Sequence, residues 1–211
     1  MRRLILLLPL VFSPVYSIGF WGSVGGGLNV GGLGEVIVYD DRGPVTVKTS
    51  PKGFITGMNL MGGVSLKPIP IAVGLGVDYY AGMQRYKFRG IWAMYALDTF
   101  EVKRIYINLP VAYQLSLPML KGYFGIYPAH ALYSVKGKGE SDWAVFKGLA
   151  FGGFVNLYFS LGFTGLGGGI FFDYGPSLKG RSKPDNTDVY INKVFHYGIN
   201  LGLLLSLGVF E

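Results

Sequence analysis

Few side chains in this sequence could carry out chemistry. The chain contains two histidines, His130 and His196, and no cysteine. A histidine could act as a general base for a nearby hydroxyl, and Ser134 follows His130 by four residues. The many glycines form no complete GxGxxG or P-loop motif, and the histidines lack the spacing of a metal site. We therefore expect no catalytic residue, no metal and no cofactor, and the absence of cysteine excludes disulfides.

Polar side chains also occur within otherwise apolar stretches. The residues concerned are Asp78, Arg104, Asn108, Asn156 and Asp173. In a strand they would share the face opposite to their apolar neighbours, because successive side chains point to opposite faces. Buried polar groups cost free energy unless they are paired. We therefore predict one internal polar network, with Asp78 and Arg104 as its first pair because their stretches are neighbours.

The positive charge is clustered but does not form one continuous stripe. The net charge of +7 falls to +5 without the first two arginines, Arg2 and Arg3. The main cluster contains Arg85, Lys87, Arg89, Lys103 and Arg104, and a smaller one contains Lys179, Arg181 and Lys183. Nucleic-acid binding usually needs a continuous basic face, so we expect no nucleic acid. Two interpretations remain: solvated loop charges, and contacts of Arg85, Lys87, Arg89 and Lys103 with lipopolysaccharide phosphates.

The first 17 residues have the three parts of a secretory signal peptide. Two arginines precede an apolar run at 4–12, and the segment ends at Ser17. The run is too short to span a bilayer as a helix, which needs about 20 apolar residues. We therefore predict an exported protein with a signal peptide at 1–17 and one mature domain at 18–211.

Composition and periodicity indicate membrane strands. Half of the residues are hydrophobic and 15% are charged, whereas soluble domains carry about 25% charged residues. Apolar residues alternate with polar or small ones in eight stretches, at 20–30, 54–66, 71–85, 100–115, 122–134, 145–157, 163–174 and 195–210. This pattern is typical of membrane strands, whose number is even in single-chain bacterial barrels. The sequence predicts an all-β fold: a closed, antiparallel, up-and-down transmembrane β-barrel of eight strands.

A helical membrane protein is the main structural alternative. The segments 148–172 and 194–210 carry no formal charge and could be read as transmembrane helices. The first of them contains eight glycines, each of which costs about 1 kcal/mol in a helix interior relative to alanine. Its phenylalanines and valines favour strands, so we prefer the barrel.

The connections between the stretches alternate in length. Those at 67–70, 118–121 and 159–162 are short, and those at 33–53, 86–99, 135–144 and 175–190 are long and polar. Outer-membrane barrels have short turns on the periplasmic side and long loops outside the cell. The dipeptide Asp41-Arg42, followed by Gly43, separates two valine-rich runs and indicates a hairpin tip. We therefore expect the first two strands to extend beyond the membrane.

The interior and the rims of the barrel can also be predicted. An eight-stranded barrel is just wide enough for side chains to fill it, so we expect a packed lumen rather than a solute pore. Aromatic residues near strand ends should form interface girdles: Tyr79, Tyr80, Tyr86, Trp92, Tyr95, Tyr123, Tyr127, Tyr158 and Tyr174. The alternation is poorest at 122–134, where we expect a β-bulge near Pro128.

Two segments resemble the OmpA-like and OmpX-like outer-membrane barrel families. They are Ile107-Asn108-Leu109-Pro110-Val111 and Gly122-Tyr123-Phe124-Gly125-Ile126-Tyr127-Pro128. The C-terminal stretch resembles the signal for the barrel-insertion machinery, although Glu211 follows Phe210. Asn108 stands where many relatives carry an acid. The resemblance implies an outer-membrane monomer surrounded by lipid, with a structural or adhesive role for its long loops.

Two other functions remain open. Some barrels of this kind modify lipid A, and His196 lies near the predicted outer end of its strand. The His-x-Ser pattern that resembles the lipid A deacylase arrangement is missing, because residue 198 is glycine. The other alternative is a narrow channel or a binder of small ligands. We expect a protein that is not an enzyme.

Overall fold

The computed structural model describes residues 17–32, 34–40, 43–67, 69–89, 98–137, 142–182 and 188–208. The predicted signal peptide, apart from Ser17, lies outside these residues. So do the predicted hairpin tip at 41–42, Trp92, Tyr95, Lys183 and the terminal Phe210.

All the regular elements of the described chain are strands. They are β1 (Ser17–Gly32), β2 (Glu35–Asp40), β3 (Gly43–Lys52), β4 (Phe54–Lys67), β5 (Ile71–Arg89), β6 (Asp98–Asn108), β7 (Val111–Leu117), β8 (Leu120–Gly137), β9 (Asp142–Leu161), β10 (Thr164–Ser182) and β11 (Asp188–Gly208). Among the described residues, no helix is long and apolar enough to cross a membrane. The helical alternative was wrong for 148–172, because β9 and β10 occupy this segment and are joined by a turn at Gly162, whose φ is 67°.

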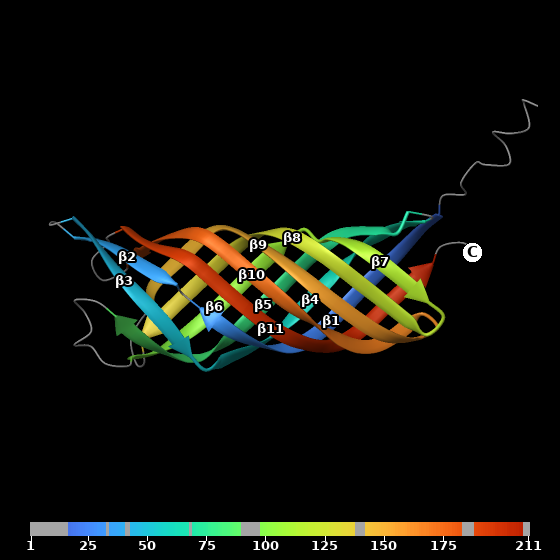
Figure 1. The fold of residues 1–211 in the computed structure, drawn as a ribbon, viewed down its shortest axis with the longest axis horizontal. Coiled ribbons are helices and arrows are strands. Elements are labelled where there is room, and N and C mark those ends of the chain that lie inside the picture. The colour runs from blue at the N-terminus through green and yellow to red at the C-terminus, as the bar shows by residue number, and fades with distance from the viewer. Residues whose placement is uncertain are drawn as a thin grey trace, which may run out of the picture.

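The strands form one closed antiparallel barrel (Figure 1). β1 pairs with β4 on one side and with the last strand, β11, on the other, so the sheet closes on itself. Three of the eleven strands lie end to end with another strand and share its position in the wall. β2 follows β1 along β11, β3 precedes β4 along β5, and β7 follows β6 between β5 and β8. Eight strands therefore make up the wall, which confirms the predicted fold class.

The two ends of the barrel differ. Three tight turns, at 69–70, 118–119 and 162–163, lie at the end where β1 begins and β11 finishes (right in Figure 1). We call it the turn end, and the opposite end the loop end. Much of the predicted long connections is strand rather than loop. β2 and β3 pair as a hairpin, β5 and β11 extend alongside this hairpin, and β10 extends alongside β11. This confirms that the first two strands extend into a longer hairpin.

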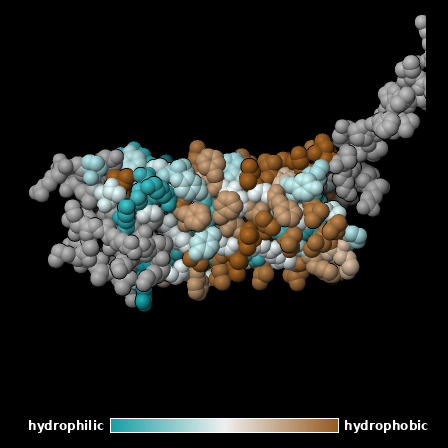
Figure 2. Space-filling view, viewed as in Figure 1, coloured by the Kyte–Doolittle hydropathy of each residue, from teal (hydrophilic) through white to brown (hydrophobic). Residues whose placement is uncertain are grey.

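The outer surface carries an apolar belt over most of the barrel length (Figure 2). Leu201 is 73% exposed, Ile126 68% and Leu166 67%. Soluble monomers rarely expose apolar patches larger than a few hundred Å². A continuous belt of this kind is the surface that lipid contacts, and the sequence periodicity places its residues correctly.

At the loop end the character of the two faces is exchanged: apolar side chains point inward and charged side chains point outward. Phe146, Leu178 and Ile191 point inward and are completely buried, whereas Lys147 and Lys179 point outward and are exposed. Apolar side chains gain free energy when they leave water, so this arrangement is the one expected where the outer wall faces water. The barrel therefore extends beyond the apolar belt as a hydrophilic-surfaced tube with its own apolar core.

The β-bulge expected near Pro128 is absent. β8 runs opposite β9 without a register shift from Leu120 to Val135, so no bulge interrupts the strand at Pro128. The alternation looked poor because the inward face of β8 contains alanines and tyrosines, such as Ala129 and Tyr133, while His130 points outward.

The prediction of an aromatic girdle was only partly correct. Tyr79 and Tyr174 point outward and are 38% and 42% exposed. Tyr80, Tyr123, Tyr127 and Tyr158 are instead buried in the interior. Tyrosine combines an apolar ring with a polar hydroxyl, so residue type alone does not decide which face of a strand it occupies. The side chain of Tyr86 lies outside the described part of the structure.

Candidate functional site

The centre of the barrel contains a buried ion pair. Arg104 on β6 donates from Nη1 to Asp173 Oδ2 on β10 over 2.9 Å, and both side chains are fully buried. The hydroxyl of Tyr127 donates to the other carboxylate oxygen of Asp173. The guanidinium carbon of Arg104 lies 4.6 Å from the ring centres of both Tyr80 and Tyr106. The two aromatic faces contact a cation that is shielded from water, where such contacts are strongest.

The closure of the barrel brings this pair together. β6 and β10 are separated in the sheet by β8 and β9, so the side chains meet across the interior rather than between adjacent strands. The predicted partner of Arg104 was Asp78, which is wrong: the ion pair is made with Asp173. Asp78 was expected as the partner because its strand, β5, is the neighbour of β6. The register instead places Asp78 opposite Tyr106, and Arg104 opposite Tyr80.

Asp78 has a different partner on the same neighbouring strand. Asn108 Nδ2 donates to Asp78 Oδ2 over 2.8 Å, and both residues are buried. Asn108 lies opposite Gly76 in the register, and a Cβ at Gly76 would collide with the Asn108 side chain. Glycine at residue 76 therefore leaves the room in which Asn108 reaches Asp78. Because Asn108 is a neutral amide, this contact is a hydrogen bond and not a salt bridge.

Asn156 lies apart from these contacts. It is buried at 2% exposure on β9, beside Gly169 of β10. Its Oδ1 atom has no hydrogen-bond partner among the described residues. The structure thus places all five predicted residues in the interior and joins four of them in two pairs.

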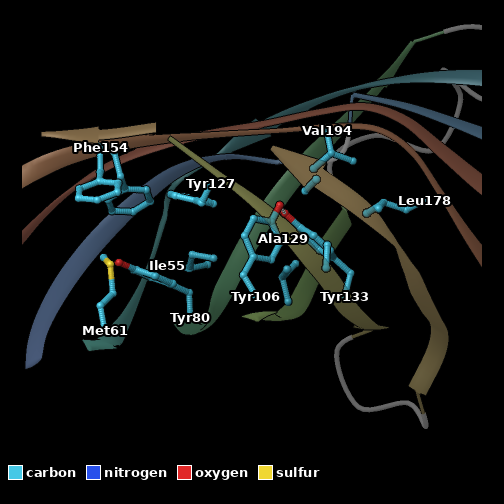
Figure 3. Packing of buried hydrophobic residues seen from close by; sticks show 14 of the residues in the cluster. Ile55, Met61, Tyr80, Tyr106, Tyr127, Ala129, Tyr133, Phe154, Leu178 and Val194 are labelled. Atoms are coloured by element: carbon cyan, nitrogen blue, oxygen red, sulfur yellow. Dashed lines mark hydrogen bonds between the residues drawn. The ribbon is translucent and has the colours of Figure 1, made fainter. Parts of the chain in front are cut away.

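A second polar chain was missed by the sequence analysis. The hydroxyls of Tyr106 and Tyr133 are 3.1 Å apart, and both residues appear in Figure 3. The Tyr133 hydroxyl lies 2.7 Å from Nδ1 of His196 and 3.1 Å from Nε2, with the two rings stacked at 5.4 Å. All three residues occupy inward positions of their strands, which is the signal that could have identified them. His196 is completely buried and does not face lipid, as a catalytic rim histidine would.

The predicted lipopolysaccharide contacts lie on β5 and β6. Arg85 and Lys103 point outward and are exposed, and Lys103 pairs with Glu101 at 3.1 Å. Lys87 and Arg89 belong to β5, but their side chains lie outside the described part of the structure. The register adds two cations that we had not considered, because Lys48 of β3 is opposite Arg89 and Lys52 is opposite Arg85.

The smaller basic group lies on β10, on another side of the barrel. Lys179 and Arg181 are exposed beyond the apolar belt. Lys179 Nζ is 3.0 Å from Asp188 Oδ2. Hydrogen bonds to Asp188 and Tyr190 raise the pKa of Lys179 above its ordinary value.

No protein-family model matches the chain, and no curated protein matches it. Similar solved structures do exist. Outer membrane protein OprG from Pseudomonas aeruginosa has a TM-score of 0.59 at 12% identity, covering 90% of this chain and 97% of that one. Neisserial surface protein A has a TM-score of 0.55 at 12% identity, covering 90% and 97%.

A major outer membrane protein from Thermus thermophilus has a TM-score of 0.54 at 14% identity, covering 90% of this chain and 99% of that one. These similarities establish the fold alone. The chain has the fold of the small eight-stranded outer-membrane barrels.

Proposed function

We propose that this chain is a monomeric, non-enzymatic outer-membrane barrel with a packed lumen. Its role is structural or adhesive, through the surface at its loop end. The fold shared with outer-membrane proteins and the exposed apolar belt support the location. The observation that carries the proposal is the filled interior at the loop end, where Phe146, Leu178 and Ile191 are completely buried.

Three successive layers support a lumen that does not conduct. The loop end holds the apolar core, and the Arg104–Asp173 ion pair follows in the direction of the turn end. Towards the turn end, the rings of Trp21 and Tyr123 are 5.1 Å apart, and Tyr158 meets Tyr123 at 6.4 Å. An ion crossing this interior would have to enter an apolar core without compensating hydrogen bonds, which costs several kcal/mol.

Conductance in planar bilayers tests the packed lumen. The purified full chain should give no steady ion-sized currents. A variant that removes apolar volume from the loop-end core, Phe146→Ala with Leu178→Ala, serves as the comparison, and a heat-modifiable band on SDS gels verifies that it is folded. Steady single-channel currents from the unaltered chain would overturn the packed lumen in favour of the narrow-channel alternative.

The adhesive role rests on the surface that the loop end presents. The β2–β3 hairpin extends this end, and Thr46 and Lys48 are exposed on it. Expression of the full chain on a non-adherent bacterium should increase attachment to host cells or matrix. A variant with 41–42 replaced by Asn-Gly, a dipeptide suited to a tight hairpin, keeps the barrel and changes the tip. Equal attachment with and without the protein would leave a purely structural role.

The basic cluster on β3, β5 and β6 is proposed to contact lipopolysaccharide phosphates. Arg85 and Lys103 are exposed, and the register brings Lys48 and Lys52 beside the cations of β5. Clustered cations attract anionic headgroups within about one Debye length. During biogenesis, the last strand is proposed to engage the barrel-insertion machinery.

A further inference from the structure

Two lysines with like charge lie directly opposite each other on the outer surface. Lys147 of β9 and Lys179 of β10 are register partners, and both are exposed. Arg181 lies two residues further along β10 on the same outward face. Like charges at directly opposite positions destabilise a sheet. An anion held between them would remove this repulsion.

One carboxylate of the neighbouring strand joins these cations. Asp188 of β11 pairs with Lys179 at 3.0 Å and is the register partner of Arg181. Three cations and one carboxylate give these four residues a net positive charge. The cations of this group lie on β9 and β10, whereas the first basic cluster lies on β3, β5 and β6, on another side of the barrel in the strand order.

An apolar groove lies within the belt, between β9 and β10 on one side and β7 and β8 on the other. It has a volume of about 360 Å³ and is lined by Val111, Phe124, Gly125, Ile126, Phe154, Val155, Ile170 and Phe172. The register places Gly153 of β9 between Ile126 and Phe172. Phe172 lies over Gly153, because a Cβ there would touch its ring. The ring of Phe172 therefore forms one wall of the groove, together with Ile170 and Val155.

The depth of the groove below the cations matches the apolar thickness of one leaflet. Six residues separate Lys147 from Gly153 along β9, or about 20 Å at about 3.3 Å per residue. With a strand tilt of about 45°, this is a descent of about 14 Å, against about 12 Å for half of the apolar band of a barrel. The groove therefore lies near the depth at which an acyl chain of the outer leaflet ends.

We propose that this surface of β9 and β10 binds one lipopolysaccharide molecule of the outer leaflet. A phosphate is held by Lys147, Lys179 and Arg181, and the end of one acyl chain occupies the groove beside Val155. The inference rests on the outer-membrane location proposed above. The net positive charge of the group favours a phosphorylated glycolipid over a zwitterionic phospholipid, and the groove requires that its acyl chain descend along β9.

The test uses the full chain in phosphatidylcholine nanodiscs, titrated with diphosphorylated lipid A and followed by native mass spectrometry. Because Arg85 and Lys103 are also proposed to contact phosphates, the comparison is made in a chain that carries Arg85→Gln and Lys103→Gln. In this chain, Lys147→Gln with Lys179→Gln should weaken binding at least tenfold. A matched control, Lys136→Gln with Lys193→Gln, removes two cations that face Glu101 and Glu35 in the structure and should change binding less than twofold. A heat-modifiable gel band verifies folding of each variant.

The groove is tested separately by Val155→Trp, which should reduce lipid A binding severalfold by filling it. Equal binding of dephosphorylated lipid A, or an unchanged affinity of the Lys147/Lys179 variant, would overturn the phosphate site. Unchanged binding by Val155→Trp would overturn the acyl-chain site. Absence of the chain from outer-membrane fractions would instead refute the proposed location, and this fractionation does not depend on lipid A binding.

Discussion

Arg104 and Asp173 form a fully buried ion pair at 2.9 Å although 69 residues separate them in the chain. Their strands face each other across the interior, so the pair ties opposite sides of the wall together. Tyr127 completes the hydrogen bonding of the carboxylate. This contact is the centre of the proposed packed lumen, and its loss should affect stability more than any other single polar change.

We expect Asp173→Asn to lower the free energy of unfolding by about 3–5 kcal/mol, because it leaves the charge of Arg104 buried without a partner. Asp78→Asn should cost about 1 kcal/mol, since Asp78 is hydrogen-bonded to the neutral Asn108. Urea unfolding in lipid vesicles measures both. A larger loss for Asp78→Asn than for Asp173→Asn would show that Asp78 is the true partner of Arg104.

The interior glycine at residue 76 should tolerate no side chain. Gly76→Ala places a Cβ against the side chain of Asn108, and overpacking of this kind costs about 1–3 kcal/mol. Gly22→Ala is the matched control, because its Cβ would meet only the Met61 carbonyl oxygen at 3.6 Å, an ordinary contact. Unfolding free energies should therefore separate the two variants, and equal values would contradict the close packing around Asn108.

The boundary of the lipid belt can be mapped with introduced lysines. Leu201 is 73% exposed within the belt, and Leu201→Lys should cost about 2–4 kcal/mol because it places a charge in lipid. Thr46 is exposed on β3, beyond the belt, so Thr46→Lys should cost at most about 1 kcal/mol. Urea unfolding in lipid vesicles measures the loss of unfolding free energy in each variant. The two losses would be equal if both residues faced water.

Substitution of the two histidines should have different effects on the stability of the barrel, and neither substitution should change lipid A. His196→Ala removes the hydrogen bond to Tyr133 inside the barrel and should cost about 1–3 kcal/mol. His130 points outward and is exposed, so His130→Ala should change stability by less than about 0.5 kcal/mol. Mass spectra of lipid A should be the same with either variant, with the unaltered chain and without the protein. A mass change that only the unaltered chain produces would establish the lipid-modifying enzyme.

The faces of the strands could be predicted without coordinates. A strand has a strict period of two, and lipid requires apolar residues on the outside. The inward positions of Asp78, Arg104 and Asp173 follow from this rule alone. Tyr80 is in phase with Asp78 and is inward by the same rule. Its assignment to the aromatic girdle, like that of Tyr123, was wrong, because the ring and hydroxyl of tyrosine suit both faces.

The sequence by itself determined the eight-stranded architecture, the lipid-facing residues and the inward positions of the five predicted polar side chains, because each depends on alternation within a strand. The tertiary structure alone decided which of those side chains meet. Closure of the barrel places β6 across from β10, so Arg104 reaches Asp173. It likewise places β8 across from β11, so Tyr133 reaches His196. Such contacts depend on register and on the curvature of the whole wall, which no local pattern encodes.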